Sequence, residues 1–194
     1  IKTPVKNYHV VGSIRSGWAL NYFKQNKINI KNEYDFCLIS DPHQYSTTGL
    51  IAKYIIKLCS EKKLTYVIAA RSNLNDGKEL LYYNQFCNLK KKNIKQNNLN
   101  SYSSYFYMLK SKIIIGQYST LLFEALSLKK KVITIHGILN NFINLDIFSR
   151  NLKSNDTSWK ENKNSYDLFK KLILEIYKMQ RSKYFNLFKN SDYF

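Results

Sequence analysis

Short apolar segments of strand-forming residues alternate along this chain with segments whose apolar residues recur at helical spacing. Strands are expected at residues 8–11, 35–39, 64–70, 112–116 and 131–135. Helices are expected at residues 18–25, 49–60, 79–89, 103–109, 119–128 and 166–177, with a further one at 183–188. Strands separated by helices form βαβ units and a parallel sheet covered on both faces. The sequence therefore predicts an α/β, Rossmann-like, doubly wound parallel sheet of about five to six strands.

The length of 194 residues and a hydrophobic content of 44% suit one packed domain. We expect its core at residues 5–137, an irregular polar loop at 138–164 and closing helices at 165–194. No apolar run approaches the roughly 20 residues of a membrane-spanning helix, and no secretory signal is visible. Three scattered cysteines indicate reduced thiols and a cytoplasmic location.

The chain carries 31 Lys and Arg against 13 Asp and Glu, a formal net charge of +18. Nearly all of the cations are Lys, and they accompany abundant Asn, Ile, Tyr and Phe, all of which have A/T-rich codons. Proteins that read nucleic acids favour Arg, of which the chain has four. We therefore expect no nucleic-acid partner, whereas contact with an anionic membrane surface stays open.

The clearest candidate site lies at residues 113–126, where a buried strand is followed by a turn and a helix start. Ligands of parallel α/β sheets bind beyond the carboxyl ends of the strands. Gly116 permits a close turn, and the Ser119-Thr120 pair opens a helix whose N-terminus favours a phosphate. Glu124, one turn further on, is placed to accept hydrogen bonds from ribose hydroxyls. The simpler interpretation is that Ser119 is an N-cap and Glu124 a solvated helix residue.

Arginines follow two other expected strands. Arg71 comes after the strand at 64–70, where its planar guanidinium suits a phosphate pair or a sugar carboxylate; the alternative is a surface side chain. Gly12, Ser13 and Arg15 follow the strand at 8–11 and form a second candidate anion-facing turn, although Arg15 could equally contact another domain.

Two histidines also follow expected strands. His43 comes after the strand at 35–39 and His136 after the strand at 131–135, so both are candidates to face a sugar or an acceptor. His43 is also readily explained as an ordinary loop residue. No spacing of Cys, His or carboxylates indicates a metal site.

The stretch at 113–133 resembles the donor-binding signature of GT-B glycosyltransferases and of the related UDP-GlcNAc 2-epimerases, with Lys129 or Lys130 where that signature has Gly. Segments 8–13, 66–71 and 165–184 resemble other parts of the same half-enzyme in the same order, so the likeness spans residues 5–185. It is closest to transferases of bacterial surface-polysaccharide assembly, including those that use CMP-activated acidic sugars.

The resemblance implies a metal-independent glycosyltransferase half that binds a CMP- or UDP-linked sugar as substrate and needs no cofactor. Its acceptor would be a glycan or glycolipid, and its general base would come from an N-terminal domain outside this chain. Such an enzyme would be cytoplasmic or peripheral at the inner face of the bacterial membrane. The alternatives are a 2-epimerase-like enzyme, for which Asp41 and Asp76 are the few acids available, and a basic module that binds RNA or membrane.

Overall fold

The computed structural model describes residues 13–41, 45–71, 78–95, 98–117, 119–136, 158–160 and 166–187. They contain a six-stranded sheet in the order β3-β2-β1-β4-β5-β6. Every neighbouring pair of strands is parallel. The strands are β1 (Tyr34–Ile39), β2 (Tyr66–Ala69), β3 (Ile94–Lys95), β4 (Ser111–Gly116), β5 (Lys131–His136) and β6 (Ser158–Lys160).

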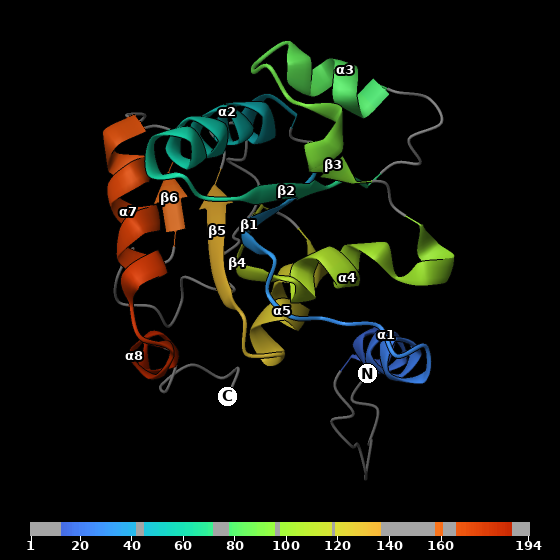
Figure 1. Cartoon of the computed structure of the whole chain (residues 1–194). Helices are drawn as coiled ribbons and strands as arrows, with labels where there is room; N and C mark the ends of the chain where they lie inside the picture. The colour runs from blue at the N-terminus through green and yellow to red at the C-terminus, as the bar shows by residue number, and fades with distance from the viewer. Residues whose placement is uncertain are drawn as a thin grey trace, which may run out of the picture.

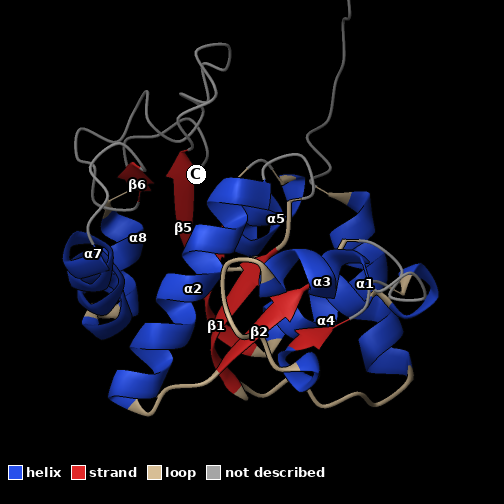
Figure 2. Cartoon of the chain, turned by 90° about the horizontal axis from the view of Figure 1, so that it is seen from above, coloured by secondary structure: helices blue, strands red, loops and turns tan. Residues whose placement is uncertain are grey.

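Helices cover both faces of this sheet (Figure 1). One face carries α2 (Tyr45–Lys62), α3 (Lys78–Asn84) and α7 (Tyr166–Lys178), and the other carries α1 (Ile14–Gln25), α4 (Ser103–Leu109) and α5 (Thr120–Ser127). Two 3-10 turns, η3 (Lys91–Asn93) and η4 (Leu99–Ser101), and a last helix, α8 (Arg181–Asn186), complete the set. Seen from above, α7 lies beside α2 (Figure 2). The predicted α/β, Rossmann-like, doubly wound architecture is confirmed.

The two central strands are apolar along almost their whole length because both of their faces are covered. In β1 the side chains of Phe36, Cys37 and Leu38 are at most 1% exposed, and Ile113, Ile114 and Ile115 of β4 are equally buried. Alternation of polar and apolar residues would have left one of these faces in water. The continuous apolar sequences of β1 and β4 are therefore explained by their burial in the middle of a parallel sheet.

Most of the expected elements are present, with bounds shifted by a few residues. The expected strand at 8–11 lies outside the described residues, and the expected helix at 79–89 ends earlier, at Asn84. It ends there because the chain turns, so that the Asn84 side chain accepts a hydrogen bond from the Leu89 N–H at 3.0 Å.

Two strands were not predicted. β3 has two residues within a lysine-rich stretch, and β6 has three within the region 138–164 that was expected to be irregular. The expectation of an irregular loop throughout 138–164 is therefore wrong at 158–160. Both strands lie at edges of the sheet, where short polar strands are common because nothing requires their outer side to be apolar.

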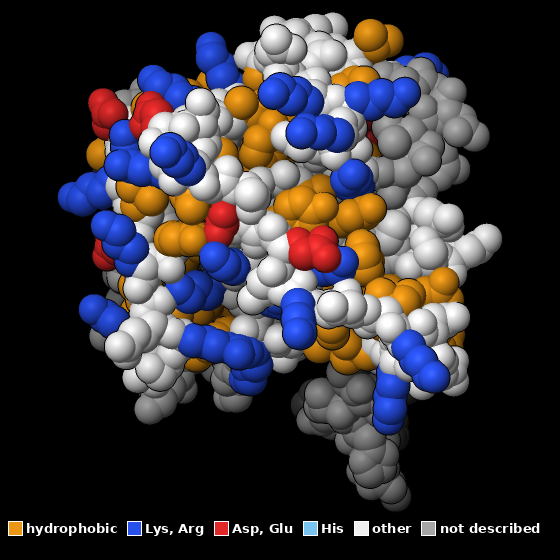
Figure 3. Space-filling view, in the orientation of Figure 1, with side chains coloured by type: hydrophobic (Ala, Val, Ile, Leu, Met, Phe, Trp, Pro, Cys, Tyr) orange, Lys and Arg blue, Asp and Glu red, His pale blue; other side chains and the backbone are white. Residues whose placement is uncertain are grey.

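The net positive charge of the chain, +18, is visible on its surface. Figure 3 shows Lys and Arg side chains over much of one face, with a concentration where α8 and the lower end of β5 lie in Figure 1. In the described part of the chain, no helix combines the length and the apolar character needed to cross a bilayer.

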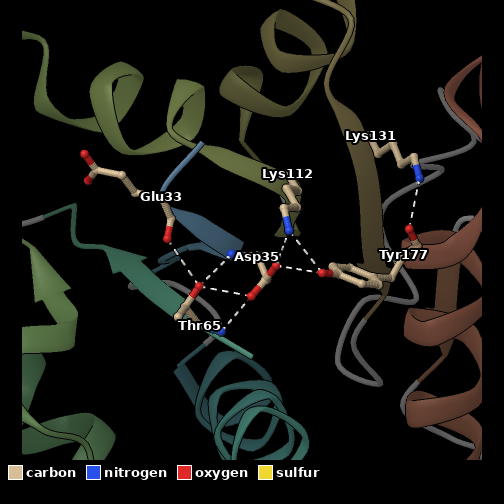
Figure 4. A network of polar contacts seen from close by, with 6 residues as sticks. All are labelled: Glu33, Asp35, Thr65, Lys112, Lys131 and Tyr177. Carbon is tan, nitrogen blue, oxygen red and sulfur yellow. Dashed lines mark hydrogen bonds and ion pairs between the residues drawn. The ribbon is translucent and has the colours of Figure 1, made fainter. Parts of the chain in front are cut away.

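A buried carboxylate ties β1 to three other elements at the amino-terminal edge of the sheet (Figure 4). Asp35 accepts hydrogen bonds from the Lys112 Nζ at 2.7 Å, the Tyr177 hydroxyl at 2.8 Å and the backbone N–H and hydroxyl of Thr65 at 2.8 and 3.0 Å. Burial by itself would raise the pKa of Asp35, but these hydrogen bonds outweigh it and hold the pKa below its usual value. The charged form is therefore favoured by folding.

The network predicts a stability difference that disappears in acid. Asp35→Asn should lower the free energy of unfolding by about 1–3 kcal/mol at neutral pH, because the Lys112 ammonium group loses its charged partner and the hydrogen bonds from Tyr177 and Thr65 lose a charged acceptor. The folded pKa lies below the unfolded value of about 3.9, so this contribution is complete above that value. It is lost as the pH falls through the folded pKa. Urea unfolding of both chains from pH 7 to pH 3 should show the difference shrinking below about pH 4.

Glu175→Gln provides the control, because Glu175 is an exposed acid on α7. It should change the free energy of unfolding by less than about 0.5 kcal/mol. A difference between wild type and Asp35→Asn that stays constant down to pH 3 would contradict the assigned pKa.

Candidate functional site

A cleft of about 490 Å³ opens at the carboxyl-terminal edge of the sheet. It lies at β1 and β4, which are neighbours but whose following helices, α2 and α5, lie on opposite faces. Such a switch point leaves a crevice because the two outgoing segments diverge. We call it the carboxyl-edge cleft. Its described lining is Arg15, Trp18, Ile39, Ser40, Asp41, Ala69, Ala70, Arg71, Tyr102, Ser104, Tyr105, Gln117, Ser119, Thr120 and Leu121.

The start of α5 forms one wall of this cleft. Ser119 is the N-cap, and its Oγ accepts a hydrogen bond from the Leu121 N–H at 3.3 Å. Its carbonyl oxygen accepts from the Leu122 N–H at 3.0 Å, which begins the helix. Thr120 is exposed. The first turn of a helix carries N–H groups without intrahelical acceptors and the positive end of the macrodipole, so this wall favours an anion.

Gly116 makes this wall possible by close packing. A Cβ at this position would lie 3.1 Å from a Leu122 methyl carbon and 3.3 Å from the Ile39 Cβ. Those contacts are tighter than side chains normally accept, so a larger residue would push β4 away from β1 or from α5. Gly116 does not line the cleft among the described residues, and its expected contact with a phosphate stays a prediction.

Two arginines and one buried acid set the charge of the cleft. Arg15 and Arg71 both line it, and the Arg71 side chain is 57% exposed. The Arg71 Nη1 lies 4.0 Å from the Oδ1 of Asp41, whose side chain is only 6% exposed. The Arg71 backbone N–H donates to the Oε1 of buried Glu79 at 3.4 Å. Asp41 therefore lies beside the Arg71 guanidinium and Glu79 contacts the Arg71 backbone, while the guanidinium remains accessible to solvent.

Gln117 carries an unsatisfied polar atom at the floor of the cleft. The residue is 7% exposed, and its Oε1 accepts a hydrogen bond from the Thr48 hydroxyl at 3.5 Å. Its Nε2 is buried and has no hydrogen-bond partner among the described residues. A buried amide without a partner costs about 1–3 kcal/mol, so this position favours a ligand that brings an acceptor.

Glu124 lies behind the lining and holds two neighbouring helices to α5. Its Oε1 accepts a hydrogen bond from the hydroxyl of Ser13, the N-cap of α1, at 2.9 Å. Its Oε2 accepts from the hydroxyl of Tyr105 on α4. Burial, followed by the Glu124 carboxylate, raises the pKa of Tyr105, so the phenol stays protonated and donates. The ribose contact expected of Glu124 and the phosphate contact expected of Ser13 stay predictions.

Three aromatic residues that the sequence did not assign to the site also line the cleft. Trp18 on α1 is 62% exposed, and Tyr102 and Tyr105 lie beside it around the cleft. Because α1 follows no described strand, Trp18 is brought here by the packing of α1 on α4, through ring contacts such as Phe23 with Phe106 at 6.1 Å, and by the Ser13–Glu124 hydrogen bond to α5. The sequence could have indicated Asp41 and Gln117 as lining residues, because each lies within two residues after the end of a strand.

The structure brings together four of the residues expected from the sequence: Arg15, Arg71, Ser119 and Thr120. Gly12 and His43 lie outside the described residues. His136 ends β5, but its side chain lies outside the described part of the structure. Within the described ranges, no group of three or more Cys, His, Asp or Glu side chains is arranged to hold a metal ion.

Comparison of the chain with protein-family models, with curated proteins and with solved structures found no match. The class of protein that the structure defines is therefore that of the fold alone: an α/β protein with a parallel, Rossmann-like sheet and a cleft at its switch point. Any function rests on the residues of the cleft, since this fold hosts many unrelated activities.

The position of Glu124 predicts an energetic coupling to Tyr105. Glu124→Ala should lower the free energy of unfolding by about 1–3 kcal/mol, because the hydroxyl of Tyr105, a residue 6% exposed, loses its acceptor. Adding Tyr105→Phe removes that hydroxyl, so the double variant should be more stable than the sum of the single effects implies, by at least about 0.5 kcal/mol. Urea unfolding of the four chains measures this coupling, and additive effects would contradict it.

Proposed function

We propose that the carboxyl-edge cleft binds the phosphate and sugar of a nucleotide-activated sugar, and that the chain supplies the donor half of a glycosyltransferase. One observation carries the proposal: the first turn of α5, the exposed Arg71 guanidinium and the unsatisfied Gln117 amide line the same cleft. Backbone N–H groups and a guanidinium are the donors that phosphates favour. The resemblance of residues 113–133 to a GT-B donor-binding signature supports the same assignment.

The chemistry would be displacement at the anomeric carbon of the sugar. The bond from that carbon to the phosphate oxygen breaks, its electron pair stays on the phosphate, and an acceptor hydroxyl oxygen forms the new bond. Negative charge therefore grows on the phosphate in the transition state. Preorganised donors at Thr120 and Arg71 would stabilise that charge, and one such donor is typically worth about 3 kcal/mol of the barrier.

The proposal leaves the second substrate to another part of the enzyme. A glycan or glycolipid acceptor must lose a proton, and the resemblance places the base that takes it in an N-terminal domain outside this chain. On this proposal the donor is CMP- or UDP-linked and no further cofactor takes part. The enzyme would act in the cytoplasm or at the inner face of the membrane.

A 2-epimerase-like activity on a UDP-sugar is the second candidate, and Asp41 is the observation that favours it. Such an enzyme needs an acid or base near the sugar, and Asp41 is a buried carboxylate that lines the cleft. Its neighbour Arg71, at 4.0 Å, would also suit a sugar phosphate. Incubation with UDP-GlcNAc and analysis of the sugar by NMR separates this activity from transfer, which requires an acceptor.

Nucleotide binding to the cleft predicts a rise in melting temperature that depends on Arg71 and Thr120. A nucleotide present at about 100 times its Kd adds about 2.7 kcal/mol to the free energy of unfolding. For a chain of this size the melting temperature should then rise by about 5–10 °C. Thermal unfolding with CMP, UDP and GDP should show this shift for one nucleotide class. Arg71→Met should weaken the affinity at least about tenfold and Thr120→Val several-fold.

Lys171→Met is the matched control, since it removes a positive charge from an exposed position on α7 that does not line the cleft. It should leave the shift unchanged. Equal loss in all three variants, or no shift with any nucleotide at millimolar concentration, would reject the proposal. Salt-dependent retention of RNA without any nucleotide shift would instead favour a basic binding module.

A further inference from the structure

The carboxyl-edge cleft has an aromatic part that the proposed phosphate contacts do not use. Trp18 on α1 lines it together with Tyr102, the N-cap of α4, and Tyr105 on α4. Trp18 is 62% exposed, and no other aromatic ring of the described residues contacts its indole. By contrast Tyr22, one turn further along α1, contacts the Phe23 ring at 5.7 Å. A broad apolar ring face is therefore left open to solvent at the cleft.

The packing of α1 does not require Trp18 at this position. Ala19 and Phe23 of the same helix are at most 2% exposed, and the Phe23 ring lies 6.1 Å from the Phe106 ring of α4. These two residues hold α1 against the core, whereas the Trp18 side chain lines the cleft. Covering the indole face with a ligand would remove apolar surface from water, which is favourable.

Tyr102 is held at the cleft in a strained backbone conformation. Its φ of 51° and ψ of 40° are in the left-handed region, where glycine is favoured and bulky side chains are rare. Its ring is fixed by the Tyr22 ring at 5.5 Å and the Tyr105 ring at 6.2 Å. Strain of this kind concentrates at ligand sites. The conformation of Tyr102 is therefore a second observation, separate from the exposure of Trp18, that points to this part of the cleft.

A guanidinium accompanies these rings. Arg15 precedes Trp18 by three residues, so the two side chains are neighbours on one face of α1, and both line the cleft. Arg15 is exposed and forms no ion pair with an acid of the described residues. Burial and the Glu124 carboxylate raise the pKa of Tyr105, and the charge of Arg15 opposes this, so the guanidinium lies near that phenol. Its N–H groups can donate to the acceptors of a planar heterocycle.

Glu124 fixes the aromatic part of the cleft relative to the start of α5. Its Oε1 accepts a hydrogen bond from the hydroxyl of Ser13, the N-cap of α1, at 2.9 Å, and its Oε2 accepts from the hydroxyl of Tyr105 on α4. One carboxylate thus ties both helices that carry the aromatic side chains to the helix whose first turn has N–H groups without intrahelical acceptors. The cleft volume of about 490 Å³ is in the range of small-molecule pockets. A ligand that spans both parts would meet side chains already held in place.

We propose that Trp18, Tyr102 and Arg15 form a base-stacking subsite, in which a nucleobase lies on the indole face. This inference rests on the proposed function, in which Thr120 and Arg71 hold the phosphate, and adds to it the residues that bind the base. Stacking on an aromatic ring tolerates every base, since each has a flat π face. The subsite therefore favours nucleotides over sugar phosphates without selecting one base.

The test titrates the full chain by calorimetry with CMP, with UDP and with ribose 5-phosphate, which is CMP without its base. Trp18→Ala should weaken nucleotide binding about five- to hundredfold, the effect of removing one stacking ring, and should change ribose 5-phosphate binding less than about twofold. Leu20→Ala is the matched control, because Leu20 is also an exposed apolar residue of α1 and does not line the cleft. It should change each affinity less than about twofold. Thermal unfolding without ligand checks that both variants are folded.

Fluorescence reports the stacking directly, because the chain has two tryptophans, Trp18 and Trp159. Trp159 belongs to β6, at the edge of the sheet. Trp159→Phe leaves Trp18 as the single indole. In that variant CMP or UDP should quench the emission with the Kd that calorimetry gives, and ribose 5-phosphate should not quench it.

The outcomes separate this inference from the proposed function. A loss of affinity in Trp18→Ala that is confined to nucleotides, together with quenching by nucleotides alone, supports the base-stacking subsite. Nucleotide binding that depends on Arg71 but is unchanged in Trp18→Ala overturns the subsite and leaves donor binding standing. Equal weakening of nucleotides and ribose 5-phosphate in Trp18→Ala, or equal weakening by Leu20→Ala, overturns it as well. Absence of binding of both nucleotides to the unmodified chain rejects the proposed function and this inference with it.

Discussion

The parallel pairing of β1 with β4 is the constraint on which the rest of this protein depends. Phe36 pairs with Ile113 and Leu38 with Ile115, and both strands are buried, so their backbone groups must be satisfied by neighbouring strands. Parallel neighbours cannot be joined by a tight turn, and their connections cross the sheet as helices. Because α2 leaves β1 on one face and α5 leaves β4 on the other, the carboxyl ends of these strands diverge and the cleft opens between them.

The same parallel arrangement gives the two edges of the sheet different electrostatics. Helices begin at the carboxyl edge, where the first turn of α5 and the guanidinium of Arg71 line the same cleft. Helices end at the amino edge, where the last carbonyls of α7 receive the Lys131 ammonium group. Helix ends attract cations there, and one pocket at this edge is lined by five cationic side chains, namely Lys112, Lys129, Lys130, Lys131 and Arg181.

Part of the candidate site follows from a rule that can be applied to the sequence, namely that ligands meet the residues just beyond strand ends. This rule found Arg71, Ser119 and Thr120, and applied to every residue it would also have found Gln117. It could not find Trp18, which reaches the cleft because Phe23 packs on Phe106 across two helices. Nor could it show that Glu124, one turn inside α5, accepts hydrogen bonds from the hydroxyls of Ser13 and Tyr105.

The sequence by itself determined the class of fold and the order of its central elements, because continuous apolar runs such as 113–115 can be buried only between two layers of helices. It did not determine the edge strands β3 and β6, whose few residues carry no periodic signal. The tertiary structure alone decided which side chains share a pocket. Lys112, Lys129 and Arg181 are far apart in the chain, and only sheet pairing and the packing of α7 and α8 bring their charges together.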